Sequence, residues 1–255
     1  MARSIFITGG ASGIGRATAQ LFAARGWRIG LADIDAATLT RTAGDLPADT
    51  ATFAFDVTQA AGWDAALAAF VADGAIDVVF NNAGIAAGGV FADMAVTAIE
   101  RTVAVNLTGV LLGAHAAHPY LKASGGCLLN TASAAGIYGT AGAAVYSATK
   151  FAVRGLTEAL DGEWAADGIA VRALMPGFID TPLLDGTLTG TNRTIRERVR
   201  EQGLEFTSLE TVAQAAWDAV HGGPVLVPVG PTARRMRFAA RWFPNALRKQ
   251  MRARR

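Results

Sequence analysis

The feature that most constrains the fold is an alternation of short apolar runs with longer helical stretches along almost the whole chain. Strands that alternate with helices favour a parallel sheet covered on both faces, and nearly all-apolar runs are typical of strands buried on both sides. The sequence therefore predicts one doubly wound α/β domain over residues 1–230. Its seven parallel strands are expected at SIFIT, RIGLAD, TATFAFD, AIDVVFN, GCLLNTAS, IAVRALMP and PVLVPVG.

Composition argues against several other classes of protein. Hydrophobic residues make up 51% of the 255 residues and charged residues 17%, so a disordered chain is not expected. Apolar runs do not reach the roughly 18–20 residues that span a bilayer. The start, MARSIFITGG, shows no features of a signal peptide, and the single cysteine, Cys127, is expected to be a buried, unreactive thiol. These features favour a cytoplasmic protein.

The net charge of +2 conceals a strongly basic end. Residues 234–255 contain nine Lys/Arg and no Asp/Glu, which leaves 14 basic and 21 acidic residues in the rest of the chain. Residues 231–255 are predicted to form a basic amphipathic tail, in which Pro244 ends or kinks one helix and Asn245 caps a second. Docking on the body or on a partner subunit is favoured, and peripheral contact with an anionic membrane is the sharper alternative. Nucleic-acid binding is not expected.

The first strand is followed by a glycine-rich junction, TGGASGIG, with Gly9, Gly13 and Gly15. Parallel α/β sheets bind ligands beyond the carboxyl ends of their strands. Glycine lets the backbone turn tightly and approach a pyrophosphate, whose charge then meets the free amides of the helix N-terminus. An ordinary glycine-rich turn is the alternative, but three glycines at one strand-to-helix junction favour a dinucleotide site.

The second strand ends in Asp33, 18 residues after Gly15. A carboxylate at this distance suits the ribose hydroxyls of NAD and repels the 2′-phosphate of NADP. Ser12 and Ile34, which stand where a cation for that phosphate would be expected, are both uncharged. The alternative is that Asp33 caps a helix, a role for which Asp35 competes. NAD is therefore the predicted cofactor and NADP the runner-up.

A second polar pair lies past the middle of the chain, where YSATK places Tyr146 and Lys150 four residues apart on one face of a predicted helix. Any amphipathic helix can supply such a pair. The pair gains meaning because other motifs accompany it in a fixed order. Together with TGGASGIG they include FDV, NNAG, AVNLTG, NTASAAG and PGFIDTP.

In order and spacing these segments resemble the classical short-chain dehydrogenase/reductase family over residues 3–182, and more loosely to Gly230. The resemblance implies a Rossmann-type fold, a nicotinamide dinucleotide and a catalytic set of four residues. It places adenine contacts in FDV, ribose contacts near NNAG and carboxamide contacts in PGFIDTP. The expected catalytic residues are Asn106, Ser133, Tyr146 and Lys150. The expected cofactor contacts are Gly9, Ser12, Gly13, Ile14, Gly15, Asp33, Ile34, Asp56, Val57, Asn82, Ala83, Gly84, Tyr146, Lys150, Pro176, Gly177, Ile179 and Thr181.

Hydride transfer to or from a carbonyl carbon requires a proton on or off its oxygen. A phenol has an ordinary pKa near 10, and a neighbouring cation such as Lys150 is expected to lower the pKa of Tyr146. Ser133 would hold the charge that develops on the substrate oxygen. By resemblance, Lys150 also binds the nicotinamide ribose, and Asn106 holds a water beside it. The alternative is that all four residues satisfy the polar ends of buried elements.

The predicted function is an NAD(H)-dependent oxidoreductase acting on a neutral, lipophilic secondary alcohol or ketone. Its pocket is expected at residues 85–91, 134–138 and 178–206, which are largely small or apolar near the catalytic set and place no arginine plainly beside it. The alternatives are an NADP(H)-linked carbonyl reductase and a non-catalytic dinucleotide-binding protein.

No metal is expected, and His115 and His118 are predicted to lie on a helix surface. The end, VPVGPTARRMRF, departs from the Asp-Gly-Gly type segment that helps many family members form tetramers. A homodimer through the helices around 97–118 and 144–166 is therefore predicted, and a tetramer is left open.

Overall fold

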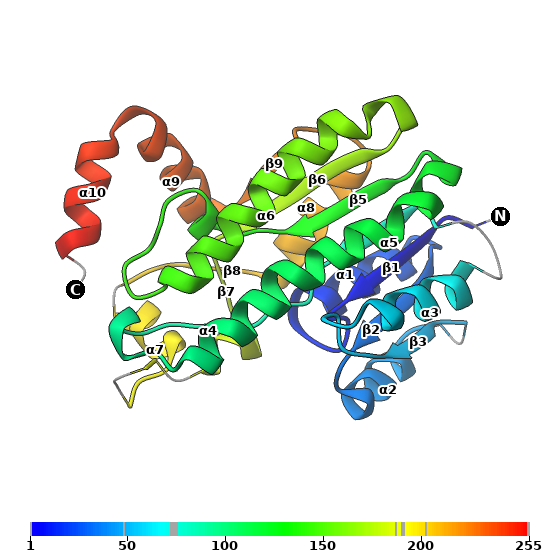
Figure 1. The fold of residues 1–255 in the computed structure, drawn as a ribbon, viewed down its shortest axis with the longest axis horizontal. Helices are drawn as coiled ribbons and strands as arrows, with labels where there is room; N and C mark the ends of the chain where they lie inside the picture. The colour runs from blue at the N-terminus through cyan, green and yellow to red at the C-terminus, as the bar shows by residue number, and fades with distance from the viewer. Residues whose placement is uncertain are drawn as a thin grey trace.

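The computed structural model describes residues 2–47, 49–71, 76–186, 188–189, 192–201 and 203–253. Its centre is a parallel sheet of seven strands in the order β3-β2-β1-β4-β5-β6-β9 (Figure 1). The prediction of a seven-stranded parallel sheet is confirmed. The order reverses between β1 and β4, so a crevice is expected beyond these strands. The strands are β1 (Ser4–Thr8), β2 (Arg28–Asp33), β3 (Ala51–Ala54), β4 (Val78–Asn81), β5 (Cys127–Thr131), β6 (Ala170–Pro176) and β9 (Leu226–Val229).

Helices cover both faces of this sheet, as a doubly wound fold requires. One face carries α1 (Gly13–Ala24), α2 (Ala36–Gly44) and α8 (Leu209–Val220). The other carries α3 (Ala60–Val71), α5 (Gly109–Ser124) and α6 (Ala144–Glu163).

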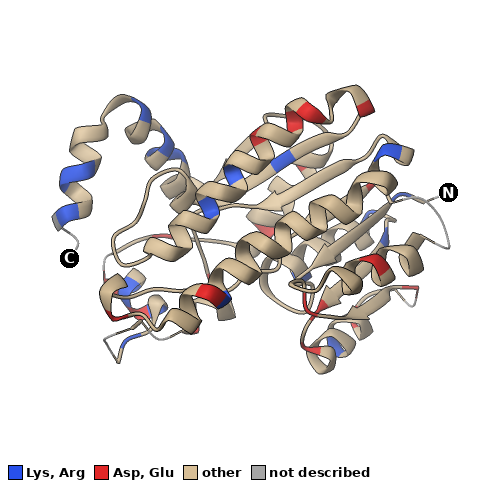
Figure 2. Ribbon diagram, viewed as in Figure 1, with Lys and Arg blue, Asp and Glu red and all other residues tan. Residues whose placement is uncertain are grey.

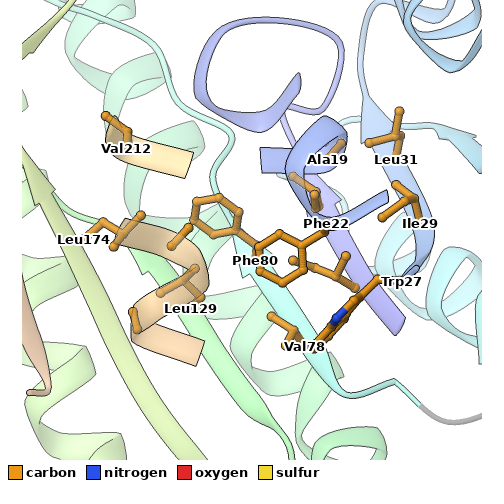
Figure 3. Close-up of a cluster of buried hydrophobic side chains, with 14 of the residues drawn as sticks. Ala19, Phe22, Trp27, Ile29, Leu31, Val78, Phe80, Leu129, Leu174 and Val212 are labelled. Carbon is orange, nitrogen blue, oxygen red and sulfur yellow. The ribbon is translucent and has the colours of Figure 1, made fainter. Parts of the chain in front are cut away.

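Strand β1 shows how the sequence fills both layers of the core. Side chains alternate across a strand, so Ile5 and Ile7 point to the α1/α8 face while Phe6 points to the α3/α5 face. On the first face, Phe22 and Phe80 lie in one packed cluster with side chains from β1, β2, β4, β5, β6 and β9, part of which Figure 3 shows. On the second, Phe6 contacts the ring of Trp63 at a centroid distance of 6.3 Å. Burial of both faces explains why the strands are apolar throughout.

The helix expected around 97–118 is longer than predicted and irregular. It comprises α4 (Val96–Val103), a π-helical turn (Ala104–Thr108) and α5, which continues through Pro119 to Ser124 and ends at Gly125 with φ of 62°. Val96–Ser124 is long and apolar enough to cross a membrane by length and composition alone. However, α5 packs against α3, β4 and β5, which makes it a core helix of the fold.

The segment between β6 and α8 contains elements that were not predicted. Two-residue strands β7 (Phe178–Ile179) and β8 (Phe206–Thr207) pair in parallel, and a short helix α7 (Ile195–Glu201) lies between them in sequence. Such short strands leave no periodic signal in the sequence. Residues 187, 190, 191 and 202, which belong to the predicted pocket segment 178–206, lie outside the described residues.

The basic tail forms α9 (Gly230–Trp242) and α10 (Pro244–Ala253). The predicted break at Pro244 is present, but the prediction that Asn245 caps the second helix is wrong, because α10 already begins at Pro244. Proline suits the first turn of a helix, where its missing N–H has no partner to lose. Arg254 and Arg255 lie outside the described residues. The division between residues 1–230 and 231–255 stays a prediction.

Candidate active site

A cavity of about 610 Å³ opens at the carboxyl ends of the central strands. Its wall includes Gly9 after β1, Asp33 at the end of β2, Asn82 after β4, Ser133 after β5 and Pro176 at the end of β6. The cavity therefore lies at the switch in strand order. Every predicted site residue lines it except Gly15 and Asn106, which are buried behind the wall.

The glycine-rich junction after β1 needs glycine for two different reasons. Gly9 and Gly13 have φ of 63° and 52°, in the left-handed region that favours glycine. Gly15 has no such φ, but a Cβ there would overlap the carbonyl oxygen of Gly9 and approach Asn82 Nδ2 at 2.8 Å. Ser12 makes no side-chain capping bond to α1, and the first turn of α1 holds no acidic residue. The helix N-terminus is thus open to an anion.

Asp33 is held by backbone amides rather than by a helix. Its Oδ2 accepts a hydrogen bond from the Ala11 amide at 3.1 Å, and its Oδ1 accepts one from the Asp35 amide at 3.2 Å. Asp35 is the residue that caps α2, since its carboxylate accepts from the Thr38 amide at 3.0 Å. The alternative role of Asp33 as a helix cap is therefore excluded, and its carboxylate lies fixed at the cavity wall.

Asn82 joins the ends of three strands. Its Nδ2 donates to the Thr8 carbonyl at 3.0 Å and to the Gly9 carbonyl at 3.3 Å, while its Oδ1 accepts from the Thr131 hydroxyl at 3.1 Å. These bonds fix the glycine-rich junction relative to β4 and β5.

The FDV segment lies farther along the same wall. Asp56 and Val57 both line the cavity, and Asp56 Oδ2 pairs with Arg101 Nη1 at 3.2 Å. Burial raises the pKa of Asp56, but hydrogen bonds from Thr58 and Arg101 outweigh it and leave that pKa below its ordinary value. Asp56 thus stays ionised and paired with Arg101 at neutral pH.

The four predicted catalytic residues converge from three elements. Lys150 is buried, donates from Nζ to the Thr131 carbonyl at 2.7 Å and lies with that nitrogen 5.6 Å from the centroid of the Tyr146 ring. Asn106, in the π-helical turn, exchanges two hydrogen bonds of 2.8 Å with the Ile85 backbone. A single π-turn in an α-helix often marks a functional position. Here it places a buried amide one layer behind Lys150, next to Gly84.

Burial dominates the pKa values at this site. It raises the pKa of the Tyr146 phenol, and a hydrogen bond with Ser133 lowers that pKa only in part. It lowers the pKa of Lys150 to about 8. The net shift of Tyr146 is thus upward, opposite to the direction expected from Lys150 as a neighbouring cation. The physical reason is that removal of the phenol from water disfavours its anion.

The PGFIDTP segment closes the cavity above the glycine-rich junction. Thr181 lies so close to Gly13 that a Cβ on Gly13 would approach Thr181 Cγ2 at 3.1 Å. Ile179 and Thr181 both line the cavity. Thr181 therefore lies beside the glycine-rich junction, and the predicted contact of this segment with the carboxamide stays a prediction.

Several residues of the cavity wall were not predicted from the sequence. Residues 140–143 contribute backbone and small side chains, and the tail contributes Met236 from α9 and Met251 from α10. Arg198 of α7, within the predicted pocket segment 178–206, also lines the cavity. Arg198 reaches the cavity because α7 lies against Gly142, far from it in the sequence. The residues around Arg198 in the sequence do not predict that contact.

Other polar groups have structural roles. His118 pairs with Asp167 at 2.9 Å and lies against Trp164, while Cys127 is buried with its pKa raised to about 12 by burial. Within the described part of the chain, no group of three or more His, Cys, Asp or Glu side chains could hold a metal ion.

Comparisons with known proteins agree with the fold and the motifs. Residues 3–191 match the model of the short chain dehydrogenase family. The chain is 40% identical over 182 residues, 70% of each protein, to a 3-alpha-(or 20-beta)-hydroxysteroid dehydrogenase of Mycobacterium tuberculosis. It is 37% identical over 194 residues, 72% of this chain and 75% of the relative, to a trans-4-hydroxycyclohexanecarboxylate dehydrogenase of Sinomonas cyclohexanicum.

A solved structure agrees over nearly the whole length. A short chain dehydrogenase/reductase from Burkholderia phymatum in complex with NAD superposes with a TM-score of 0.85 at 26% identity, covering 98% of this chain and 95% of that one. The chain therefore belongs to the short-chain dehydrogenase/reductase family of oxidoreductases, with that family's Rossmann-type fold.

Proposed function

We propose that the protein is an NAD(H)-dependent oxidoreductase that transfers a hydride between nicotinamide and the carbonyl carbon of a lipophilic secondary alcohol or ketone. The observation that carries the proposal is one cavity lined both by the glycine-rich junction with Asp33 and by Ser133, Tyr146 and Lys150. A dinucleotide-binding protein without turnover needs only the first of these groups. The second adds a proton donor and a cation facing the same space.

The residues present fit a nicotinamide dinucleotide. The amides at the start of α1 meet a pyrophosphate, and the Asp33 carboxylate meets ribose hydroxyls. Asp56 and Val57 would border the adenine end, while Lys150, Ile179 and Thr181 would border the nicotinamide end; all five line the cavity. A bound nicotinamide supplies the hydride donor or acceptor.

The proton of the substrate hydroxyl is transferred by side chains of the protein itself. The raised pKa of Tyr146 keeps its phenol protonated at neutral pH, ready to donate to a carbonyl oxygen during reduction. In the opposite direction Tyr146 must first lose its proton, and protonated Lys150 then favours the phenolate. Ser133 donates a hydrogen bond to the reacting oxygen. Asn106 positions the backbone around Ile85 and lies beside Lys150.

NAD is the proposed cofactor and NADP the runner-up. The fixed carboxylate of Asp33 would face a 2′-phosphate directly, and Ile34 beside it is exposed and uncharged. Of the described residues that line the cavity, the cations are Arg101, Lys150 and Arg198. Arg101 is already paired with Asp56. A neighbour in the same family was solved with NAD.

The proposed substrate is a cyclic secondary alcohol or its ketone. Ile85, Leu184, Leu188 and two methionines give the cavity an apolar wall, which suits a neutral, lipophilic ring. The two relatives named above act on a hydroxysteroid and on a hydroxycyclohexanecarboxylate. Arg198 favours a second candidate, a ring that also carries a carboxylate, because a guanidinium at the wall can pair with it.

The proposal is tested with a panel of cyclic secondary alcohols and ketones, with and without a carboxylate, assayed with NAD(H) and NADP(H). We expect turnover followed by absorbance of the reduced nicotinamide, with higher kcat/KM for NAD(H). Preference for NADP(H) would favour the carbonyl reductase alternative. Tight NADH binding without turnover on any member of the panel would favour the non-catalytic alternative.

A further inference from the structure

Three large aromatic side chains lie exposed around the bend between α9 and α10. Phe238, Trp242 and Phe243 are 60%, 61% and 55% exposed, and we call them the aromatic patch. The rings of Phe238 and Phe243 are 5.9 Å apart between centroids, and the Arg241 guanidinium lies 5.3 Å from the centroid of the Trp242 ring. A cluster of exposed aromatic rings marks a surface that binds a partner.

The same two helices carry a strong positive charge. No Asp or Glu occurs in residues 234–253, and Figure 2 shows blue but no red segments along α9 and α10. The exposed cations of these helices are Arg234, Arg235, Arg237, Arg241, Arg248, Lys249 and Arg252. A partner for this surface must therefore combine negative charge with an apolar region.

The shape of the surface narrows the choice of partner. Figure 1 shows that α9 leaves the sheet after β9 and that its bend into α10 projects from the body. A projecting bend of this kind can contact a wide, deformable surface more readily than it can enter a pocket on a partner protein. Duplex nucleic acid would satisfy the cations but leave the aromatic rings without an apolar partner. The headgroup boundary of an anionic bilayer accepts both, because aromatic rings enter it and cations attract its charge.

We propose that the aromatic patch and its flanking cations dock the protein on an anionic lipid bilayer. The opposite side of the same helices faces the body. Ala233 and Leu247 are buried, and Met236 and Met251 line the cavity. Docking therefore places the cavity wall beside the bilayer, where lipophilic compounds concentrate. The proposal needs no cofactor or turnover, so it stands or fails independently of the proposed function.

The test is co-sedimentation of the full-length protein with phosphatidylglycerol-containing vesicles and with pure phosphatidylcholine vesicles, at low and high salt. We expect binding to the anionic vesicles at low salt, and a drop of at least about 10-fold in partitioning at high salt, because surface cations are screened. The variant Phe238→Ser/Trp242→Ser/Phe243→Ser should lose at least about 10-fold in partitioning while its circular dichroism and Tm are kept. The control Phe91→Ser, at an aromatic ring 57% exposed on the body, should bind as wild type does.

Tryptophan fluorescence gives a second readout. Trp27, Trp63 and Trp164 are buried and Trp217 is partly buried, so Trp242 is the exposed one of the five. Brominated lipid should quench the wild type, and Trp242→Phe should lose that quenching while it keeps vesicle binding. Wild-type protein that stays in the supernatant at low salt overturns the proposal. Vesicle binding that survives the triple substitution also overturns it, since cations alone would then explain the binding. A triple variant that loses vesicle binding and also shifts to a smaller oligomer overturns it too, because a second copy would then be the partner of the patch.

Discussion

At the residue scale, burial sets the protonation of Tyr146 and Lys150. It raises the pKa of the phenol and lowers that of the ammonium to about 8, so both shifts disfavour the charged form. The sequence predicted both residues and their shared helix face, since a spacing of four residues determines it. It did not predict the upward shift of Tyr146, because burial depends on every element that packs around α6.

The direction of the Tyr146 shift predicts opposite pH dependences for the two reaction directions. Ketone reduction needs the phenol, so its kcat/KM should hold at neutral pH and fall as pH rises through the raised pKa. Alcohol oxidation needs the phenolate, so its kcat/KM should rise with pH over the same range. Profiles from pH 5 to 11 in both directions check this. Oxidation that is fastest in acid would contradict the assignment.

The carboxylate of Asp33 predicts cofactor choice. Asp33→Ala should weaken NAD binding, because the ribose hydroxyls lose an acceptor. The ratio of kcat/KM for NAD to kcat/KM for NADP should fall by about 10-fold or more, because the charge that repels the 2′-phosphate is also removed. Asp35→Ala is the matched control. It removes the α2 cap, which lowers stability, and should leave the ratio of kcat/KM for NAD to that for NADP unchanged. A wild-type enzyme that already prefers NADP would refute this reading.

At the element scale, regular elements were predictable and irregular ones were not. Seven apolar runs and the glycine-rich junction predicted the parallel sheet and a ligand site at the end of its first strand, because buried parallel strands and a strand-to-helix turn have strong local patterns. The pairing of β7 with β8 and the continuation of α5 through Pro119 follow from tertiary packing. The same is true of α7 and α10, which bring Arg198 and Met251 to the cavity from far along the chain.

The contact of α10 with the cavity predicts an effect on substrate binding. Met251→Ala removes apolar wall and should raise KM for a bulky lipophilic substrate by about 5- to 30-fold, the equivalent of about 1–2 kcal/mol, while KM for NAD stays unchanged. Leu247→Ala is the control, since Leu247 is buried one turn earlier on α10 and does not line the cavity. It should lower Tm without raising KM. Equal effects of both substitutions on KM would contradict the assignment of Met251 to the substrate wall.

At the scale of the whole molecule, exposed apolar side chains on α4, α5 and α6 support the predicted homodimer. Val103, Leu111 and Phe151 are each exposed by more than a third. Leu111 and Phe151 lie on α5 and α6, which pack against the sheet, and Val103 lies on α4, which packs against α6. We propose that a second copy covers this face. The sequence predicted these helices. Which of their apolar side chains stay exposed could be seen only in the structure, because exposure depends on how the helices pack.

The dimer proposal predicts a change of mass on substitution. Leu111→Asp with Phe151→Asp should convert a dimer to a monomer in light scattering coupled to size-exclusion chromatography, because two charges would be buried without partners. Phe238→Asp, at an exposed ring of the tail, should leave the mass unchanged. A wild-type monomer, or a double variant that keeps the wild-type mass, would rule out this interface.

The central claim, that Tyr146 moves the proton in a cavity that also binds the dinucleotide, is tested most directly by Tyr146→Phe. This substitution keeps the ring and removes the proton. We predict that kcat falls by about 10²–10⁴, the range for loss of an acid/base group, while the Kd for NADH, from fluorescence titration, changes by no more than about 3-fold. The control is Tyr138→Phe, because Tyr138 is a nearby tyrosine that does not line the cavity. Its kcat and its Kd for NADH should match those of the wild type. Turnover of Tyr146→Phe near the wild-type level would contradict the account.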